Sequence, residues 1–367
     1  MSHQVVRYYS IIYYIVSKVT LHPVFPKNRG SFHRFPPLHL LSLEVSQITC
    51  HGIGKKEDYM HIGIAGTGNI ATSFAALFTG NGYKTTVIGR SEASIKKLRD
   101  AYSSIFDVLE ERKLVTGTQR KNCATLLSCS THWEDLSDAE IIFEAVYEDV
   151  NIKFEIFKEI ETHCPNVRAI ASATSVLAPA DLIKGFKKLG PRFMVAHPFN
   201  PAHIVPLVEL VGSDETSGET VRLIKEFLES CGRKVIIMKK SVPGFIANRL
   251  QHAMMREAMH IVEEGIATPA EIDMVLSYSF IPRYTKVGIF EHHDGYGMDM
   301  LKNLQNYLYP HLSNDKGASP LVLEAIKQGN LGQKTGKGLL DWNPASIAQF
   351  KRNAIEPYWH FFNWKLP

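Results

Sequence analysis

From residue 60 onward, short apolar runs alternate with segments that have helical spacing. Residues 61–65 (HIGIA) are typical of a strand, and Ile70, Phe74, Leu77 and Phe78 then share one face of a helix. Further strands are expected near residues 84–88, 140–144, 167–171, 192–196, 204–211 and 234–238, with helices at 92–113 and 151–161. Strands that alternate with helices predict a mostly parallel sheet covered on both faces, with ligands bound at the carboxyl ends of its strands.

The pattern changes after residues 242–244 (VPG). Residues 245–264 have apolar side chains at helical spacing, and the period ends at Gly265. Thr268 and Glu271 then form a capping box with Pro269 at the first helical position, which predicts another helix. We therefore expect an α/β protein, with a Rossmann-type domain over residues 60–242 and an all-helical domain over 243–367.

Residues 1–59 differ from the rest of the chain. Their apolar run, residues 8–17, has only ten residues, short of the roughly 20 that span a bilayer. A Pro- and His-rich stretch without regular period follows, which predicts low order. No acidic residue precedes Glu44, so a mitochondrial transit peptide is an alternative, although the Arg-rich amphipathic helix typical of one is missing.

A misplaced translation start explains these residues better. Met60 directly precedes the first predicted strand, and the codons allowed for residues 56–58 (KED) can spell a bacterial ribosome-binding sequence just upstream. We therefore expect residues 1–59 to be a poorly ordered extension and the native protein to begin at Met60.

Composition and charge narrow the class of partner. The chain has 367 residues, of which 45% are apolar and 21% charged, as in a globular protein of about two domains. The net charge of +4 comes from the first 59 residues, which hold seven Lys/Arg and three Asp/Glu, whereas residues 60–367 hold 34 of each. A neutral body without a basic stripe disfavours nucleic acid. Five cysteines without metal-like spacing indicate free thiols in a reducing compartment, and we expect a cytoplasmic protein.

A glycine motif, G-x-G-x-x-A, follows the first predicted strand. Gly66 allows the tight turn, Gly68 lets the backbone approach a pyrophosphate, and Ala71 permits close packing of helix on strand. Phosphates would then meet free amides at the helix N-terminus. In this strand-turn-helix context the motif predicts dinucleotide binding by residues Gly66, Thr67, Gly68, Asn69, Ile70 and Ala71.

The end of the second strand bears on the choice of cofactor. An NAD-specific site places an acid there to bind the ribose 2′-hydroxyl, but this chain has Gly89-Arg90-Ser91. Arg90 can clamp a 2′-phosphate and Ser91 can hydrogen-bond it, which makes NADP a candidate beside NAD. The alternative is that Arg90 stacks on adenine without a phosphate preference.

His197 is the candidate general base. It follows a buried-looking strand, and Glu209 lies on the next apolar run (PLVELV). A carboxylate that holds an imidazole fixes its tautomer and stabilises the cation formed when the ring takes up a proton. Taken alone, a histidine in this position is more often a hydrogen-bonded structural residue than a base, and the neighbouring motifs favour the base. Glu148 and Ser172–Ser175 also follow strands and share this edge of the sheet.

Several motifs in order give the chain a family resemblance. They are the glycine turn, FEAVYEDVNIK at 143–153, SATS at 172–175, HPFNPAHIVPLVELV at 197–211, VPGFIANRL at 242–250 and GQKTGKGLLDW at 332–342. With these, residues 60–342 resemble the L-3-hydroxyacyl-CoA dehydrogenase family. The resemblance implies a homodimer formed through the helical domain, a role in fatty acid metabolism, and hydride transfer to a nicotinamide with His197 and Glu209 as the catalytic pair. It also implies that Ser175 and Asn248 hydrogen-bond the substrate.

The same resemblance carries cofactor contacts onto Glu148, Lys153, Ser175, Asn200 and Lys334. Each has a plainer interpretation: Glu148 as a solvated acid, Lys153 as an exposed base, Asn200 as a turn cap and Lys334 as a surface residue. Two departures from the family pattern stand out. Ala173 replaces an asparagine that many members have, and Gly89 replaces the ribose-binding acid.

The Arg283-Tyr284 pair resembles the branch of the family that contains lambda-crystallin (L-gulonate dehydrogenase) and carnitine dehydrogenase. An arginine that faces the cleft can bind a free substrate carboxylate in a bidentate manner. It can equally pair with Glu291 or Asp294 as part of the scaffold. The neighbouring residues 292–297 (HHDGYG) are interpreted as a polar loop, and no metal site is predicted.

Three functions remain open at this point. The first is NAD(P)-dependent oxidation of a short-chain 3-hydroxyacyl-CoA. The second is oxidation of a free 3-hydroxy acid with Arg283 as the anchor. The third is a dinucleotide-binding protein without catalysis, which the presence of Ser175, His197, Glu209 and Asn248 disfavours. All three involve small molecules, with neither nucleic acid nor membrane as partner.

Overall fold

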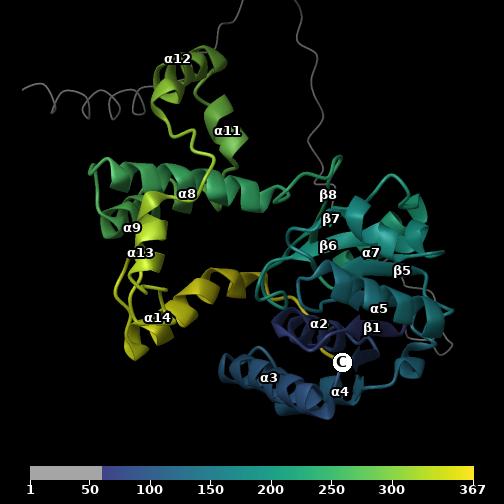
Figure 1. Ribbon diagram of the computed structural model, residues 1–367. Helices are drawn as coiled ribbons and strands as arrows, with labels where there is room; N and C mark the ends of the chain where they lie inside the picture. The colour runs from purple at the N-terminus through teal and green to yellow at the C-terminus, as the bar shows by residue number, and fades with distance from the viewer. Residues whose placement is uncertain (1–59) are drawn as a thin grey trace, which may run out of the picture. The chain divides into compact units, whose positions relative to one another are not determined.

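A computed structural model describes residues 60–367 of the chain (Figure 1). The expectations for residues 1–59, namely low order and a start at Met60, lie outside the described residues. In the part of the chain that is described, every helix is too short or too polar to cross a membrane.

One eight-stranded sheet forms the first part of the structure, with strand order β3-β2-β1-β4-β5-β6-β7-β8 (Figure 1). Neighbouring strands are parallel except β6 and β7, which run antiparallel. The predicted mostly parallel sheet is confirmed. Its strands are β1 (Ile62–Ala65), β2 (Thr85–Ile88), β3 (Leu127–Ser130), β4 (Ile141–Glu144), β5 (Ala169–Ser172), β6 (Phe193–Pro198), β7 (Leu207–Val211) and β8 (Lys234–Ile237).

Helices cover both faces of this sheet. Successive residues of a strand point to opposite faces, and the core accordingly divides into two clusters. Ile141 and Phe143 of β4 join the cluster that includes α2 and α7, whereas Ile142 joins the cluster that includes α5. The helices of this part are α2 (Asn69–Gly80), α3 (Glu92–Glu111), α4 (Gly117–Thr125), α5 (Val150–His163), α6 (Pro179–Leu182) and α7 (Gly218–Ser230).

Two strands of this part differ from the sequence-based expectation. Strand β3 was not predicted, because its sequence, LSCS, is mostly polar and it lies at the edge of the sheet, where no alternation is needed. The strand expected over 204–211 begins only at Leu207. The amides of Ile204 and Val205 both donate to the carbonyl of Pro201, so these residues form a turn.

The second part is helical, as predicted. Helix α8 begins close to the expected residue and ends before Gly265, whose φ is +68°. Thr268 and Glu271 form the predicted capping box at the start of α9. The helices are α8 (Ala247–Glu263), α9 (Pro269–Tyr278), α10 (Ile281–Tyr284), α11 (Ile289–Asp294), α12 (Met298–Leu308), α13 (Pro320–Lys327) and α14 (Pro344–Ile355). The predicted domain boundary at 242/243 lies in the connection between β8 and α8.

Helices α8 to α14 contain no buried residue. Their amphipathic spacing would place some apolar side chains in a core, but these side chains are exposed to solvent. Leu250 is 63% exposed, Tyr278 87% and Phe290 88%. Large exposed apolar patches on soluble proteins often coincide with interaction sites.

The C-terminal segment, residues 356–367, returns to the sheet domain. The Trp364 side chain is buried in the cluster that includes α2, and a Cβ atom at Gly80 would lie only 2.2 Å from its ring. The amide of Leu366 donates to the carbonyl of Gly80 at 2.9 Å. Arg112 of α3 pairs with Glu356 at 2.5 Å and lies 4.3 Å from the ring centroid of Trp359. The end of the chain is therefore tied to the first two helices of the sheet domain.

Candidate active site

The glycine turn has the geometry that the motif requires. Gly66 has φ of +119°, and a Cβ atom there would lie 2.5 Å from the carbonyl oxygen of Ala145, so only glycine fits. At Gly68, by contrast, a Cβ atom would meet nothing within 4 Å. Helix α2 begins after Gly68 without a side-chain cap and without an acid in its first turn. Its first amides are thus free to bind an anion, and buried Ala71 packs inward as expected.

A cleft of about 1030 Å³ opens in front of this turn. Residues Gly66–Ile70, Arg90 and Ser91 of the predicted cofactor set all line it, together with Val146 and Tyr147, which follow β4. The lining contains no acidic residue. The cleft combines an uncapped helix N-terminus with the cations Arg90 and Lys97. This combination fits a dinucleotide, because its pyrophosphate is anionic.

Gly89, which replaces the ribose-binding acid, is closely packed. A Cβ atom at this position would lie 2.7 Å from Ile95 and 2.9 Å from the side chain of Thr67. A larger residue there would require the side chains of Ile95 and Thr67 to shift. Beside it, Arg90 is exposed and Ser91 caps α3 by accepting from the amide of Ser94 at 3.3 Å. Ser91 therefore has a structural task in addition to the predicted one.

The predicted catalytic pair forms. His197 on β6 and Glu209 on β7 are directly paired in the antiparallel register. Nδ1 of His197 lies 2.9 Å from Oε2 of Glu209, and both side chains are almost fully buried. Nε2 of His197 makes no hydrogen bond within residues 60–367. It is nevertheless not one of the fully buried polar atoms of that part that lack a hydrogen-bond partner. The ring thus has one nitrogen held by the carboxylate and one open to an incoming group.

Glu209 also joins this pair to the helical domain. Its Oε1 accepts from the amides of Ile246 and Ala247, at 2.9 and 3.0 Å, at the start of α8. Asn248 follows directly and lines a second cleft, of about 920 Å³, along α8. One carboxylate therefore fixes both the imidazole and the helix that carries a predicted substrate ligand.

Two aromatic side chains that sequence reasoning missed flank the His197 ring. The centroid of Phe199 lies 4.9 Å from that of the imidazole, and the centroid of Phe245 lies 5.2 Å from it. Phe245 is buried and has φ of +49°, a conformation that non-glycine residues rarely adopt. Only the fold brings Phe245 to the ring, because it lies 48 positions beyond His197 in the chain.

Glu148, Lys153 and Ser175 come together near the ends of β4 and β5. Lys153 is only 1% exposed and bridges Glu148 to Glu144, so its interpretation as an exposed base was wrong. Glu148 in turn accepts from the amide of Ser175 at 3.1 Å. Sequence reasoning missed Glu144 as a site residue, since an acid at the end of a buried strand has no local signature.

Asn200 and Lys334 lie outside both clefts. Each is exposed, Asn200 in the β6–β7 connection and Lys334 in the turn between α13 and α14. Glu148, Lys153 and Ser175 also line neither cleft, but they contact one another, whereas no ion pair or side-chain hydrogen bond within residues 60–367 joins Asn200 or Lys334 to them. Their assignment stays a prediction.

Arg283 contacts neither of the carboxylates proposed as scaffold partners. Its Nη1 lies 2.9 Å from Nε2 of His292, and Tyr296 contacts the same ring nitrogen through its hydroxyl at 3.2 Å. Glu291 instead caps the start of α11, where it accepts from the amide of Gly288. The loop expected over 292–297 was wrong, because its first three residues belong to α11.

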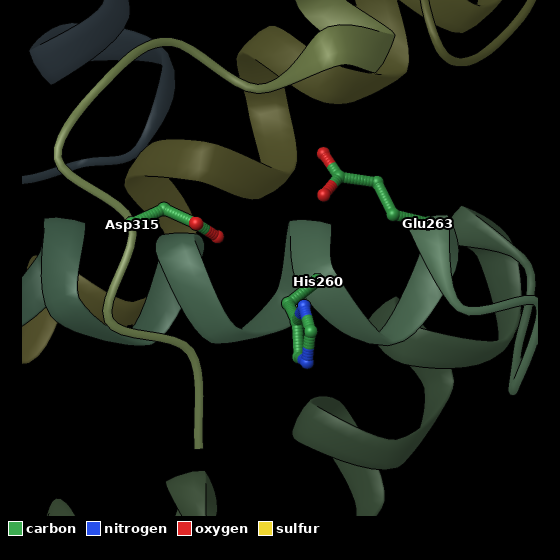
Figure 2. A group of neighbouring side chains, drawn as sticks. All are labelled: His260, Glu263 and Asp315. Atoms are coloured by element: carbon green, nitrogen blue, oxygen red, sulfur yellow. The ribbon is translucent and has the colours of Figure 1, made fainter. Parts of the chain in front are cut away.

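His260, Glu263 and Asp315 form a group whose potential ligand atoms lie within 4.8 Å of one another (Figure 2). The first two come from α8, and Asp315 lies in the segment that leads to α13. Ser319, which caps α13, donates to Glu263, and Ser313 donates to Asp315 at 2.6 Å. These hydroxyl donors account for the positions of both carboxylates.

The comparisons with known proteins agree with this geometry. Sequence models of the NAD-binding domain and the C-terminal domain of 3-hydroxyacyl-CoA dehydrogenase match residues 61–241 and 244–342. An L-carnitine dehydrogenase from Oceanobacillus iheyensis is 33% identical over 233 residues, which cover 62% of this chain and 73% of the relative.

Two solved structures are similar to this one. The structure of 5-formyl-3-hydroxy-2-methylpyridine 4-carboxylic acid 5-dehydrogenase, an NAD⁺-dependent dismutase, matches with a TM-score of 0.74 and 26% identity, and the match covers 82% of this chain and 96% of that one. The structure of (S)-3-hydroxybutyryl-CoA dehydrogenase from Ralstonia eutropha matches with a TM-score of 0.64 and 28% identity, over 78% of this chain and 99% of that one. The chain belongs to the 3-hydroxyacyl-CoA dehydrogenase family of NAD-dependent oxidoreductases.

Proposed function

We propose that this protein oxidises a secondary hydroxyl group of a small hydroxy acid, with His197 as the general base. The observation that carries the proposal is the His197–Glu209 pair, which leaves Nε2 of the imidazole open. With Nδ1–H donated to Glu209, the lone pair of Nε2 takes the hydroxyl proton. A bound nicotinamide supplies the acceptor for the hydride from the same carbon. Ser175 and Asn248 hold the substrate oxygens.

A free carboxylate on the substrate is supported by Arg283. Among residues 60–367, no Asp or Glu forms an ion pair with its guanidinium. Its partner, His292, has a pKa below the ordinary value because of desolvation and the nearby charge of Arg283. The names of two relatives contain the substrates L-carnitine and a pyridine carboxylic acid, and both of these molecules carry a carboxylate.

A CoA thioester of a 3-hydroxy acid is the second candidate. It is supported by the similarity to (S)-3-hydroxybutyryl-CoA dehydrogenase. Both candidates use the same base, so the two differ in what Arg283 does.

The cofactor is NAD or NADP. The NAD-binding domain supports NAD. The adenosine end of the cleft supports NADP as well, because Arg90 and Lys97 both line it and neither has an ion-pair partner among residues 60–367. A clear preference for NAD in Michaelis constants would exclude the phosphate-clamp role of Arg90.

The test is a screen of both cofactors against free 3-hydroxy acids and 3-hydroxyacyl-CoA thioesters, with wild type and Arg283→Ala. We expect Arg283→Ala to raise KM for the free acids about tenfold to a hundredfold, the value of one or two hydrogen bonds to a charged group, with kcat less affected. Lys286→Ala, which removes a neighbouring exposed cation, is the control. Unchanged kinetics with free acids in Arg283→Ala would make Arg283 structural and favour the thioester.

We also propose that the helical domain is covered by a second copy of the chain. The exposed apolar residues lie on most of its helices, and an identical domain offers a matching apolar surface to cover them. Leu250→Glu is expected to convert a dimer to monomers in size-exclusion chromatography with light scattering. Val108→Glu, at a 37% exposed residue of the sheet domain, should leave the dimer intact. A wild-type monomer at micromolar concentration would contradict this assignment.

A reducing, cytoplasmic location is the proposal that the thiols support. Cys123, Cys164 and Cys231 are free and buried, and burial raises the pKa of Cys123 to about 11 and that of Cys231 to about 12. Such cysteines remain protonated and act as small apolar core residues.

A further inference from the structure

A buried ionic network lies between the ends of two neighbouring strands of the sheet domain. Glu144 ends β4, and Lys153 belongs to the first turn of α5. Nζ of Lys153 lies 2.9 Å from each carboxylate oxygen of Glu144 and 3.2 Å from Oε2 of Glu148. The Glu144 and Lys153 side chains are 0% and 1% exposed. All three ammonium protons of Lys153 therefore have carboxylate partners inside the protein.

Glu148, at one end of this network, binds the segment that carries Ser175. Oε1 of Glu148 accepts from the hydroxyl of Thr174 and from the amides of Ser175 and Val176, at 3.1 and 3.4 Å. Glu144 holds the start of the same segment by accepting from the hydroxyl of Ser172 at 2.6 Å. Both ends of residues 172–176 are thus fixed to carboxylates that share one lysine.

We propose that Glu144 and Lys153 are positioning residues that fix Ser175 through Glu148. This inference rests on the proposed function, in which Ser175 binds a substrate oxygen. Lys153 holds the Glu148 carboxylate in place and keeps it ionised, and that carboxylate orients the backbone of Ser175. The arrangement gives Lys153 a task inside the protein, as the shared partner of two carboxylates.

The energetics favour a positional role over a stabilising one. Glu144 and Lys153 place an ion pair in a buried site, whereas the Glu148 side chain is 34% exposed, and buried ion pairs seldom repay the loss of hydration. Burial by itself raises the pKa of Glu148, but the hydrogen bond from Thr174 and the charge of Lys153 outweigh it and hold that pKa below its usual range. Without Lys153, Glu148 would take up a proton at a higher pH and accept hydrogen bonds less strongly.

The network is tested with the full-length Lys153→Met variant. Because small misplacements of a binding group cost about tenfold to a hundredfold, we expect kcat/KM to fall by that factor while the dissociation constant of the cofactor stays within about twofold. The activity should also acquire a new loss at acid pH, since Glu148 now protonates there. Lys158→Met, which removes an exposed lysine of the same helix, is the control.

A second variant tests the same network without removing a buried charge, which could by itself unfold the protein. Thr174→Val removes one donor to Glu148, keeps the shape of the side chain and leaves every charge in place. It should give the same pattern with a fall of about tenfold, the value of a hydrogen bond to a charged acceptor. If Lys153 acts through Glu148, adding Lys153→Met to Glu148→Gln costs little more than Glu148→Gln alone. Losses that simply multiply would contradict the proposal.

Hydrogen exchange separates this proposal from the proposed function. In both variants the amides of Ser175 and Val176 should exchange at least tenfold faster than in wild type, whether or not a substrate has been found. If these amides exchange faster in the variants but the protein oxidises neither a hydroxy acid nor a thioester, the proposed function is rejected and the positioning role of Lys153 stands. Unchanged exchange of these amides in a folded Lys153→Met variant would overturn the proposal that Lys153 positions Ser175.

Discussion

Replacing His197 with alanine is expected to lower kcat/KM by about a hundredfold to ten-thousandfold, the usual contribution of a general base. In the proposed reaction Nε2 of His197 takes the hydroxyl proton, and no other imidazole of residues 60–367 pairs with Glu209. The dissociation constant of the cofactor should stay close to that of wild type, because the glycine turn lies on β1 and α2. Steady-state kinetics and a cofactor titration measure the two quantities.

His163→Ala is the matched control for this variant. His163 also pairs with glutamates, at 3.3 Å from Glu134 and 3.4 Å from Glu159, but it is the last residue of α5 and its side chain is 29% exposed. Its removal should leave turnover unchanged. Full turnover in His197→Ala with the cofactor still bound would mean that another group is the base.

Glu209→Gln is expected to reduce kcat on the order of a thousandfold, although the substitution is nearly isosteric. The amide oxygen will stay with the amides of Ile246 and Ala247, because both need an acceptor. The amide nitrogen then faces Nδ1 of His197, which must become the acceptor. The proton moves to Nε2, and that nitrogen can no longer take a proton from the substrate.

The same variant distinguishes tautomer control from a loss of structure. Since the cap of α8 survives, the melting temperature and the cofactor affinity should change little. Glu209→Ala removes the acceptor for both amides and should in addition loosen the start of α8, seen as faster exchange at residues 246–248. Glu209→Gln with wild-type kcat would show that the carboxylate does not set the tautomer.

The register of β6 and β7 is what makes this pair possible. Both strands are short, and a shift of one residue would turn Glu209 to the opposite face of the sheet. The connection between them is held by Arg233, whose buried guanidinium donates to the carbonyls of Ala202 and Val205 at 3.5 and 3.3 Å. The connection between the two candidate catalytic residues is thus held by a buried residue outside the motif.

Local patterns predicted the parts of the site that are built from neighbouring residues. The glycine turn is such a case, since its backbone conformation and the helix after it are encoded within residues 62–71. Lys153 is the opposite case: a lysine in the first turn of a helix looks solvent-exposed, and only Glu144 nine positions earlier makes its burial possible. Sequence spacing does not reveal such pairing, because it depends on how α5 packs on β4.

The amino-acid sequence by itself determined the class of fold, the dinucleotide turn and the identity of the candidate base, because hydrophobic period, glycine placement and short motifs act over a few residues. Only the tertiary structure decided that Gly89 is closely packed, that Arg283 contacts His292, and that Glu209 serves both His197 and α8. These contacts join residues far apart in the chain or depend on packing at one atom, and their geometry is fixed by the sheet register and by burial.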